Sequence, residues 1–345
     1  MSYQVELLGA HEEGYWESFI LGQPDSTPCH QIGWRRVIEE SFGHETYYLV
    51  GKDAWGKIGA ALPIVRVKSR LFGNSLVSMP FLNYGGIVSV DAEAEGTVLN
   101  RSIEIAKEIG ADYLELRYDR ERPWPTPVKT RKVAMWLDLP STAGILWDVL
   151  PSKLRSQIRR PMKEGMEVRW GAEEEVEAFY KVFSTNMRDL GTPVYGIHFF
   201  KLILKVFKDQ ARICVVYWKG SPVASGLFIA FRDRFEIPWA SSLQSANKLS
   251  PNMLLYWSAL QYACDHGYRV FDFGRSTIGA TTFKFKEQWG AKPVPLHWYY
   301  PYRTGSDLPA VDVDNPRYKL AIGVWRRLPL WVTHRLGPRI VRGIP

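Results

Sequence analysis

The chain has 345 residues, 46% of them hydrophobic, with 14 tryptophans, 17 tyrosines and 16 phenylalanines. This length suits two domains of ordinary size, and the composition excludes a disordered chain. The three cysteines are too few and too scattered for a disulfide framework or a zinc site, so we expect no metal. No segment resembles a signal peptide or a membrane span, and we expect a cytoplasmic protein with a soluble body.

The positive charge is concentrated in two clusters. The formal net charge is +8 and the pI is about 9.2. One cluster lies between Lys153 and Lys163, and the other is the tail after Asp314, which contains no acid. Both clusters indicate an anionic partner such as a phosphate, a tRNA or an anionic lipid surface, and we do not expect DNA. A solvated basic face explains the first cluster equally well.

The first half of the chain predicts alternating helices and strands. A cap at Ser26-Thr27-Pro28 begins a helix that reaches Phe42 and ends at Gly43. A second helix is expected over residues 94–109. Strands are expected at residues 47–50, 58–67, 75–79, 86–90, 113–117 and 133–139.

The second half repeats this order at nearly constant spacing. Residues 267–273 repeat residues 110–116, and strands at 213–217 and 223–231 repeat the first hairpin. The helix at the start of the first half also recurs: Thr192, Pro193, Ile197, Phe199 and Phe207 match Thr27, Pro28, Ile32, Trp34 and Phe42. Two copies of one unit predict duplicated α+β domains rather than a single large sheet.

The stretch from Ser250 to Lys292 carries most of the candidate chemistry. Ser250 and Pro251 cap a helix that runs to His266. The following strand, residues 269–273, has Val270 and Asp272 on one face and Phe271 and Phe273 on the other; we expect Gly274 to end it, before a short helix at residues 283–289. This order places Asp272, Arg275 and Lys286 near the carboxyl end of one strand, where ligand crevices commonly lie.

Three motifs in this stretch resemble a known family. S-P-x-x-L-L, D-F-G-R and F-K-x-x-W-G are similar to the C-terminal half of FemAB-like proteins and to CelD/BioF2-like acyltransferase domains. The most similar subgroup is the FemAB-related type associated with exosortase (PEP-CTERM) systems. The resemblance covers roughly residues 10 to 300. It implies α+β architecture with two tandem acyl-CoA N-acyltransferase (GNAT-like) domains, each a mixed, mostly antiparallel sheet flanked by helices.

The resemblance and the repeat together imply a division of the chain. We expect a first GNAT-like domain at 1–140, a second at 141–300, and a basic extension at 301–345 that is interrupted by prolines. In FemAB-like proteins the end of the chain can return to the first domain.

The resemblance also implies site residues. Lys286 matches the lysine of the F-K motif, which lies near the transferred carbonyl in Fem proteins. Asp272 and Arg275 complete the expected catalytic set, although an Asp–Arg pair that only fixes the loop is an equally good interpretation. The expected substrate-binding residues are Arg155, Arg159, Asn83, Tyr84, Phe285 and Trp34. Arg155 and Arg159 lie one helical turn apart, as a phosphate clamp requires, but Pro161 puts the geometry of that helix in question.

We therefore predict an acyltransferase that moves an aminoacyl or acyl group to an amine of a cell-envelope or exopolysaccharide precursor. No tightly bound cofactor is expected, and the donor is aminoacyl-tRNA or acyl-CoA. The segment 244–250 has no glycine, which departs from a typical acetyl-CoA loop and favours a Fem-like donor. The alternatives are an acetyl-CoA-dependent N-acetyltransferase and, in another class, a tandem domain that binds a polymer or partner without turnover.

The tail, residues 316–345, leaves two alternatives open. Its apolar residues approximate one helical stripe, and Pro329 and Pro338 are expected to break it into short pieces. It either packs back on the first domain or holds the protein at the inner face of the cytoplasmic membrane. In the second case Trp325 and Trp331 enter the lipid interface while arginines meet anionic headgroups.

Overall fold

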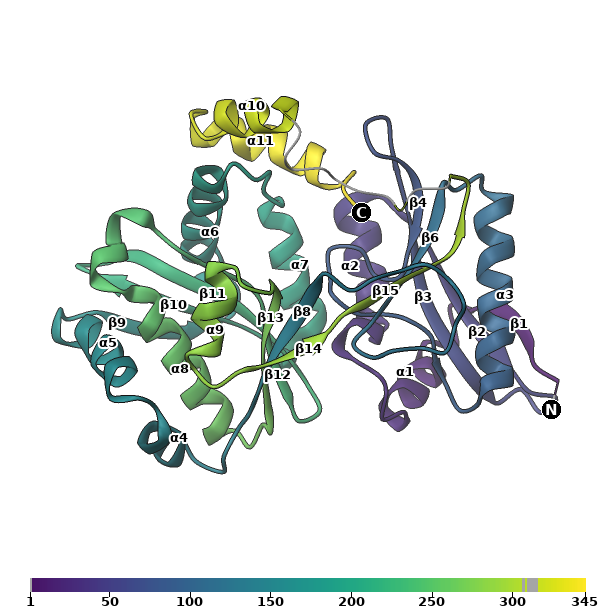
Figure 1. Ribbon diagram of the computed structural model, residues 1–345, viewed down its shortest axis with the longest axis horizontal. Coiled ribbons are helices and arrows are strands. Elements are labelled where there is room, and N and C mark those ends of the chain that lie inside the picture. Colours follow the sequence, from purple (N-terminus) through teal and green to yellow (C-terminus); the bar gives the residue numbers. More distant parts are fainter. Residues whose placement is uncertain (1, 306–307, 309–315) are drawn as a thin grey trace. The chain divides into compact units, whose positions relative to one another are not determined.

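The structure is a computed structural model that describes residues 2–305, 308 and 316–345 (Figure 1). It divides into two compact units. Unit 1 comprises Met1–Val133, Val294–Ala310 and Arg342–Pro345, and unit 2 comprises Ala134–Pro293 and Val311–Val341. The expected boundaries at 140 and 300 are therefore corrected. The strand after the first repeat, β8 (Lys132–Asp138), joins the sheet of unit 2, and the strand after the second repeat, β15 (His297–Arg303), joins the sheet of unit 1.

Unit 1 is built on one mixed sheet in the order β1-β2-β3-β4-β6-β15-β7, with β5 paired to β3. Its neighbours run antiparallel except β4 and β6, which are parallel. The elements are β1 (Gln4–Leu7), α1 (Glu13–Gly22), the 3-10 turn η1 (Pro28–His30), α2 (Gly33–Phe42), β2 (Glu45–Lys52), β3 (Ile58–Ser69), β4 (Gly73–Val77), β5 (Val88–Ser89), α3 (Ala92–Glu108), β6 (Tyr113–Tyr118), β7 (Val128–Lys129) and β15 (His297–Arg303).

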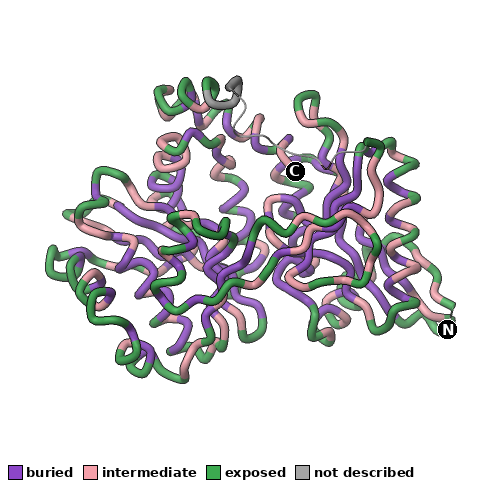
Figure 2. Tube along the Cα trace, in the orientation of Figure 1, coloured by how far each residue is buried: buried purple, intermediate pink, exposed green. Residues whose placement is uncertain are grey.

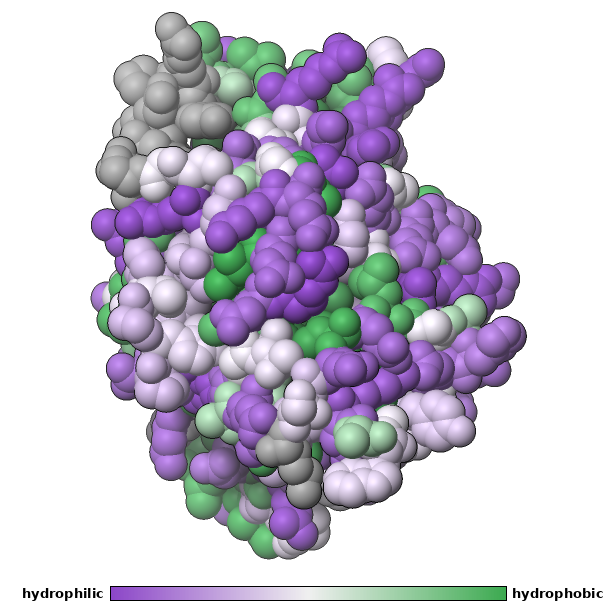
Figure 3. Space-filling view, turned by 90° about the vertical axis from the view of Figure 1, so that its right-hand side faces the viewer, coloured by the Kyte–Doolittle hydropathy of each residue, from purple (hydrophilic) through white to green (hydrophobic). Residues whose placement is uncertain are grey.

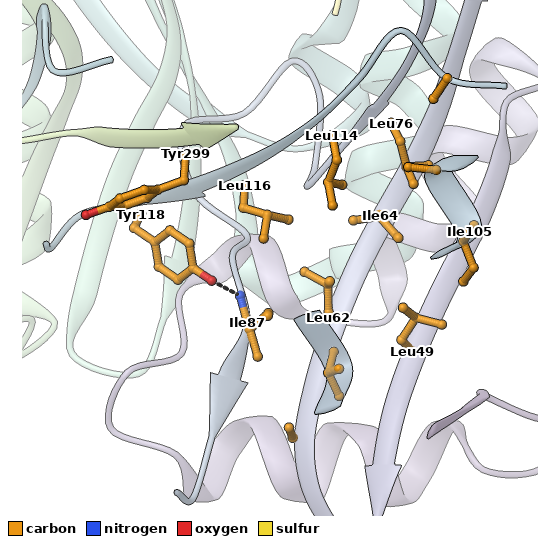
Figure 4. Packing of buried hydrophobic residues seen from close by; sticks show 14 of the residues in the cluster. Leu49, Leu62, Ile64, Leu76, Ile87, Ile105, Leu114, Leu116, Tyr118 and Tyr299 are labelled. Atoms are coloured by element: carbon orange, nitrogen blue, oxygen red, sulfur yellow. Dashed lines mark hydrogen bonds between the residues drawn. The ribbon is translucent and has the colours of Figure 1, made fainter. Parts of the chain in front are cut away.

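The core of unit 1 forms where α3 packs on the sheet. Figure 4 shows leucines and isoleucines of β2, β3, β4 and β6 gathered beside Ile105 of α3. Tyr118 closes one end of this cluster, and its hydroxyl accepts a hydrogen bond of 2.7 Å from the Ile87 N–H. Asp91 caps α3 by accepting from the Ala94 N–H at 2.8 Å. In Figure 3, which faces the side where α3 lies, hydrophilic side chains cover most of the surface and hydrophobic ones appear as separate patches.

The expected first helix is present but divided. Pro28–His30 forms a 3-10 turn, and the α-helix begins at Gly33 and ends at Gly43, whose φ is +66°. His30 explains the division, since its Nδ1 accepts from the Thr27 N–H at 3.0 Å while its Nε2 donates to the Gly86 carbonyl at 2.8 Å. Burial lowers the pKa of His30 to about 4, so the ring is neutral at physiological pH. Helix α1 was not anticipated from the sequence.

Unit 2 repeats the plan with a sheet in the order β14-β8-β13-β12-β11-β10-β9. Helices α6 and α7 cover one face, and α8, backed by α4 and α5, covers the other (Figures 1 and 2). The elements are β8 (Lys132–Asp138), α4 (Ala143–Val149), α5 (Ser152–Lys163), β9 (Glu167–Gly171), η2 (Glu173–Glu175), α6 (Val176–Leu190), α7 (Ile197–Phe207), η3 (Lys208–Gln210), β10 (Ala211–Trp218), β11 (Ser221–Phe231), β12 (Arg234–Ser242), η4 (Gln244–Leu249), α8 (Pro251–Asp265), β13 (Val270–Thr277), α9 (Thr281–Glu287) and β14 (Lys292–Pro295).

The sequence repeat corresponds to equivalent positions in the two units. Trp34 of α2 and Phe199 of α7 are both buried, as are Phe42 and Phe207 at the ends of the same helices. Strands β6 and β13, which carry the second repeated segment, each follow a long helix and pair in parallel with a strand that lies before that helix in the chain. The duplication expected from the sequence is therefore present in the fold.

The tail forms helices α10 (Pro316–Trp325) and α11 (Leu330–Val341). Helix α11 packs on α6 of unit 2, and only Arg342–Pro345 belongs to unit 1, so the expectation that the tail packs on the first domain is corrected. The break near Pro329 is confirmed, whereas Pro338 lies inside α11. A proline in the last turns of a helix removes one backbone hydrogen bond, and the packing of Thr333, Gly337 and Val341 compensates for that loss. Within the described residues, no helix is long and apolar enough to cross a membrane.

Candidate functional site

The parallel strands β12 and β13 separate in the middle of unit 2. Their paired register runs from Arg234–Val270 to Glu236–Asp272, while β12 continues to Ser242 and β13 to Thr277. A register shift in β12 against β11 increases its local twist. Gly274 does not end β13 as expected; it lies within the strand at φ +73°, a left-handed conformation that glycine adopts without strain. Ligands bind where neighbouring parallel strands open in this way.

Asp272 is the buried carboxylate at this opening. Its side chain is 0% exposed, and it lies on the face opposite Phe271 and Phe273, as the alternation predicts. The Trp136 indole donates to Oδ2 at 2.9 Å, and the Gly274 N–H donates to Oδ1 at 2.7 Å. The Arg234 guanidinium lies 4.0 Å from Oδ2. The buried carboxylate is therefore compensated by a cation and by directed N–H donors.

Glu236 was missed by the sequence analysis. It is the direct neighbour of Asp272 in the parallel pair and is 4% exposed. Arg234, two residues earlier on the same strand, stacks over Trp136 with its Cζ 3.9 Å from the ring centroid. Charged residues alternating with Phe235 and Ile237 in an apolar strand are the signal that would have identified this second acid.

Lys286 reaches the same opening from helix α9. Its ammonium donates to the Gly274 and Arg275 carbonyls, both at 3.0 Å, and its side chain is 7% exposed. Burial lowers the pKa of Lys286 to about 8; the nearby Asp272 and Glu236 oppose this shift and Arg275 adds to it. The ammonium has a third N–H, for which the described part of the chain provides no acceptor. This donor is available to a ligand.

Two further groups border the ammonium. The Arg275 side chain is exposed, while its backbone carbonyl binds Lys286. The Ser276 hydroxyl is buried and has no hydrogen-bond partner among the described residues. A buried hydroxyl without a partner is costly unless a ligand or water satisfies it. The segment Asp272–Ser276, Lys286 and Glu236 therefore form one compact polar cluster. We call it the strand-end cluster.

Aromatic packing fixes the other side of β13. Phe273 stacks on Tyr256 of α8 at 5.6 Å between ring centroids. Phe285 is half-buried and meets Tyr256 edge-on at 5.0 Å. Phe285 therefore positions α9, and hence Lys286, against α8.

The expected phosphate clamp lies on helix α5. Pro161 is buried within its last turn and the helix continues to Lys163, so the proline does not disrupt it. Arg155 is half-buried with NH1 3.5 Å from the Trp147 carbonyl, and Arg159 is exposed with its Cζ 5.1 Å from the centroid of the Trp147 ring. Trp147 in turn packs edge-on against Trp257 of α8. The two guanidinium groups thus flank one tryptophan.

Three expected ligand contacts lie in unit 1, and two of them are buried. Trp34 is 1% exposed, and its indole donates to the Pro28 carbonyl at 2.9 Å, so its role as a substrate contact is corrected to a core residue. Tyr84 is also buried and lines a water-sized cavity with a volume of about 10 Å³. Asn83 is half-buried next to it.

The start of helix α8 differs from the expected cap. Ser250 has φ +58° and its side chain makes no capping hydrogen bond; Pro251 begins the helix as expected. The glycine-free segment before it forms the 3-10 helix η4 instead of an open loop. No group of three His, Cys, Asp or Glu residues that could hold a metal ion occurs in the described part of the chain.

Two sheets flanked by helices, with the parallel pair β4–β6 in one and the parallel pair β12–β13 in the other, define a tandem GNAT fold. Residues 152–286 match the family model described as acetyltransferase (GNAT) domain. Among solved structures, the chain is similar to FemX, with a TM-score of 0.64, 14% identity, and coverage of 86% of this chain and 97% of that one. It is also similar to a tandem GNAT protein from the clavulanic acid biosynthesis pathway, with a TM-score of 0.56, 10% identity, and coverage of 89% and 100%.

A curated relative indicates the chemistry. UDP-N-acetylmuramoylpentapeptide-lysine N(6)-alanyltransferase from Weissella viridescens is 24% identical over 288 residues, which cover 75% of this chain and 82% of the relative. The chain therefore has the tandem GNAT fold of acyltransferases and is similar to FemX, in agreement with the FemAB-like resemblance.

Proposed function

We propose that the protein transfers an aminoacyl group to an amine of a cell-envelope precursor, and that the strand-end cluster is its catalytic centre. The observation that carries this proposal is the Lys286 ammonium, which two backbone carbonyls hold at the opening between β12 and β13 with one N–H left to donate. The curated relative is named as an alanyltransferase acting on a lysine of a precursor pentapeptide, which supports the same class of acceptor.

The cluster contains the groups that such a transfer requires. The acceptor amine attacks the carbonyl carbon of the donor ester, a C–N bond forms, and the ester C–O bond breaks. Lys286 and the Ser276 hydroxyl donate to the oxyanion that develops on the carbonyl oxygen. Asp272 or Glu236 accepts the proton that the amine loses, and a proton returns to the departing hydroxyl of the donor.

Arg275 at the edge of the cluster and two arginines outside it hold the anionic parts of the substrates. Arg275 is exposed next to Lys286, and Arg155 and Arg159 form a pair of guanidinium groups on α5. Guanidinium groups bind phosphate oxygens in a bidentate manner, which suits a nucleotide-linked precursor or the backbone of a tRNA. Each arginine therefore contributes to binding more than to the chemical step.

The proposed donor is aminoacyl-tRNA rather than acyl-CoA. The glycine-free 3-10 helix before α8 supports this choice, because a pyrophosphate-binding loop needs backbone N–H groups that glycine leaves accessible. The test is a matrix of donors and acceptors: radiolabelled alanyl-tRNA or acetyl-CoA is combined with UDP-linked pentapeptide. We expect label in the pentapeptide with alanyl-tRNA only. Transfer from acetyl-CoA alone would identify an N-acetyltransferase instead, and binding without transfer from either donor would contradict the enzymatic proposal.

The proposal extends to a narrower class of acceptor, an amino sugar. The motif resemblance to exosortase-associated (PEP-CTERM) FemAB-related proteins supports an amino sugar of an exopolysaccharide precursor as the acceptor, assembled in the cytoplasm at the inner face of the membrane. Adding an undecaprenyl-linked amino sugar to the matrix tests this choice. A faster transfer to the amino sugar than to the pentapeptide is expected, and the reverse order would assign the protein to peptidoglycan.

A further inference from the structure

The tail helices present an apolar and basic surface that the transfer chemistry does not use. On α10, Leu320 and Val324 are one turn apart and are 72% and 55% exposed. On α11, Trp331 is 71% exposed and Leu336 is 39% exposed. Large apolar side chains that stay exposed within a short helical segment indicate an interaction surface.

The opposite side of the tail is anchored in unit 2. Thr333, Gly337 and Val341 are spaced one turn apart and are buried. Gly337 lies so close to Val194 that an added Cβ would come within 2.9 Å of its backbone N and O atoms. Trp325 is 9% exposed, which corrects the expectation that it enters a membrane. The outward orientation of Trp331 is therefore set by the packing of the opposite side.

The charge around this surface has a single sign. Arg327, Arg335 and Arg339 are exposed among the apolar residues, and residues 316–345 contain no acid. Arg326 is different, because its NH2 donates to the Leu190 carbonyl at 3.3 Å and it helps to hold the tail in place. Trp331, Arg335 and Arg339 lie one turn apart in series, so one apolar and two basic side chains share one side of α11.

We propose that this surface, defined by Leu320, Val324, Arg327, Trp331, Arg335, Leu336 and Arg339, docks reversibly on an anionic lipid membrane. Tryptophan is favoured at the depth of lipid headgroups, and each arginine near an anionic surface adds to the attraction. A nucleic acid would account for the arginines but not for exposed leucine and valine side chains, which gain only by entering an apolar phase. This proposal does not depend on the catalytic assignment.

The experiment is co-sedimentation of the full chain with vesicles of phosphatidylcholine alone and with added phosphatidylglycerol. We expect binding to the anionic vesicles only and its loss at about 0.5 M salt, where the Debye length is only a few ångströms. Arg335→Glu with Arg339→Glu should weaken binding by about tenfold or more, and Trp331→Ser by several-fold. All these residues are exposed, so the fold should be retained, which thermal unfolding verifies.

Matched controls make the test specific. Arg70→Glu with Arg131→Glu changes the net charge equally on exposed residues of unit 1, and Trp55→Ser removes another exposed tryptophan. These variants should bind like the wild type. Equal weakening by the control charge reversal, binding to neutral vesicles, or binding to tRNA in place of vesicles would each overturn the proposal. Because no substrate is present, a failure here leaves the transfer proposal intact, and a failure of transfer leaves this result intact.

Discussion

The two units differ at the end of their parallel strand pair, which is closed in unit 1 and open in unit 2. In unit 1 the parallel pair β4–β6 ends at Val77–Glu115, and in unit 2 the pair β12–β13 ends at Glu236–Asp272. Glu115 and Asp272 are also equivalent in the sequence repeat. Two residues later, unit 1 has Arg117 where unit 2 has Gly274.

In unit 1 the strand end is closed by the chain itself. Arg117 is 2.6 Å from the Glu115 carboxylate and donates to the Leu82 carbonyl at 2.7 Å. The carbonyl of Arg117 accepts from the Gly86 N–H at 2.9 Å, and the Tyr300 hydroxyl binds the other Glu115 oxygen. The buried pair therefore anchors the loop that fills the opening.

In unit 2 the position two residues after the carboxylate is Gly274, so no arginine closes the opening there, and the Lys286 ammonium enters it from helix α9. Lys286 binds carbonyls of β13 and retains a donor, and its pKa lies near 8. A duplicated scaffold thus uses one buried carboxylate for stability and keeps the other beside a titratable amine. The following predictions test that difference.

The largest expected effect is on catalysis. Lys286→Met keeps the aliphatic stem and removes the charge, so we expect kcat to fall on the order of 10² to 10³-fold with a smaller change in KM. Steady-state kinetics measure this split, and Lys284→Met, exposed on the same helix, is the control. A change confined to KM would reassign Lys286 to binding in the ground state.

In unit 1 the equivalent change should affect stability instead. Glu115→Gln leaves the Arg117 charge buried without its counter-ion, which is expected to cost about 3 kcal/mol of unfolding free energy. Denaturant unfolding measures it, with the exposed Glu104→Gln as a control that should cost less than about 0.5 kcal/mol. The kcat per folded molecule should stay near the wild-type value; a 10²-fold loss would mean that unit 1 also contributes to the chemistry.

The pH dependence follows from the lowered pKa of Lys286. If the ammonium stabilises the oxyanion, its active form predominates below about pH 8 and is lost above it. Single-turnover rates should then fall about tenfold per pH unit above that value, and Lys286→Met should lack this limb. A rate that rises up to pH 8 and then levels off would show that the neutral amine acts as a base.

The smallest effect concerns the backbone of β13. Gly274→Ala places a Cβ at φ +73°, 3.4 Å from the Ile237 carbonyl, and should cost about 1 to 2 kcal/mol. Thermal unfolding measures the loss. Gly14→Ala is a matched control, because a Cβ there meets nothing within 4 Å, and this change should be neutral or stabilising. An equal response at both positions would refute the special role of Gly274.

Much of the fold was predictable because its signals are local. Gly43 and Pro251 marked helix ends, alternation identified the faces of β13, and the repeat indicated duplication. The sequence analysis missed Glu236 because β12 was not recognised, and it placed Trp34 at the substrate because aromatic residues suit ligands and cores equally well. Burial separates these two cases, and burial depends on residues far away in the chain.

The sequence by itself determined the tandem architecture, the position of Asp272 on its strand, and the nearness of Lys286 to the strand end. These follow from backbone periodicity and short loops, which act over a few residues. Only the tertiary structure decided that Lys286 binds the Gly274 and Arg275 carbonyls, that strands β8 and β15 join the sheets of opposite units, and that Trp331 faces solvent while Trp325 is buried. These features depend on which segments far apart in the chain pack against each other and exclude water, and the local sequence pattern does not contain that information.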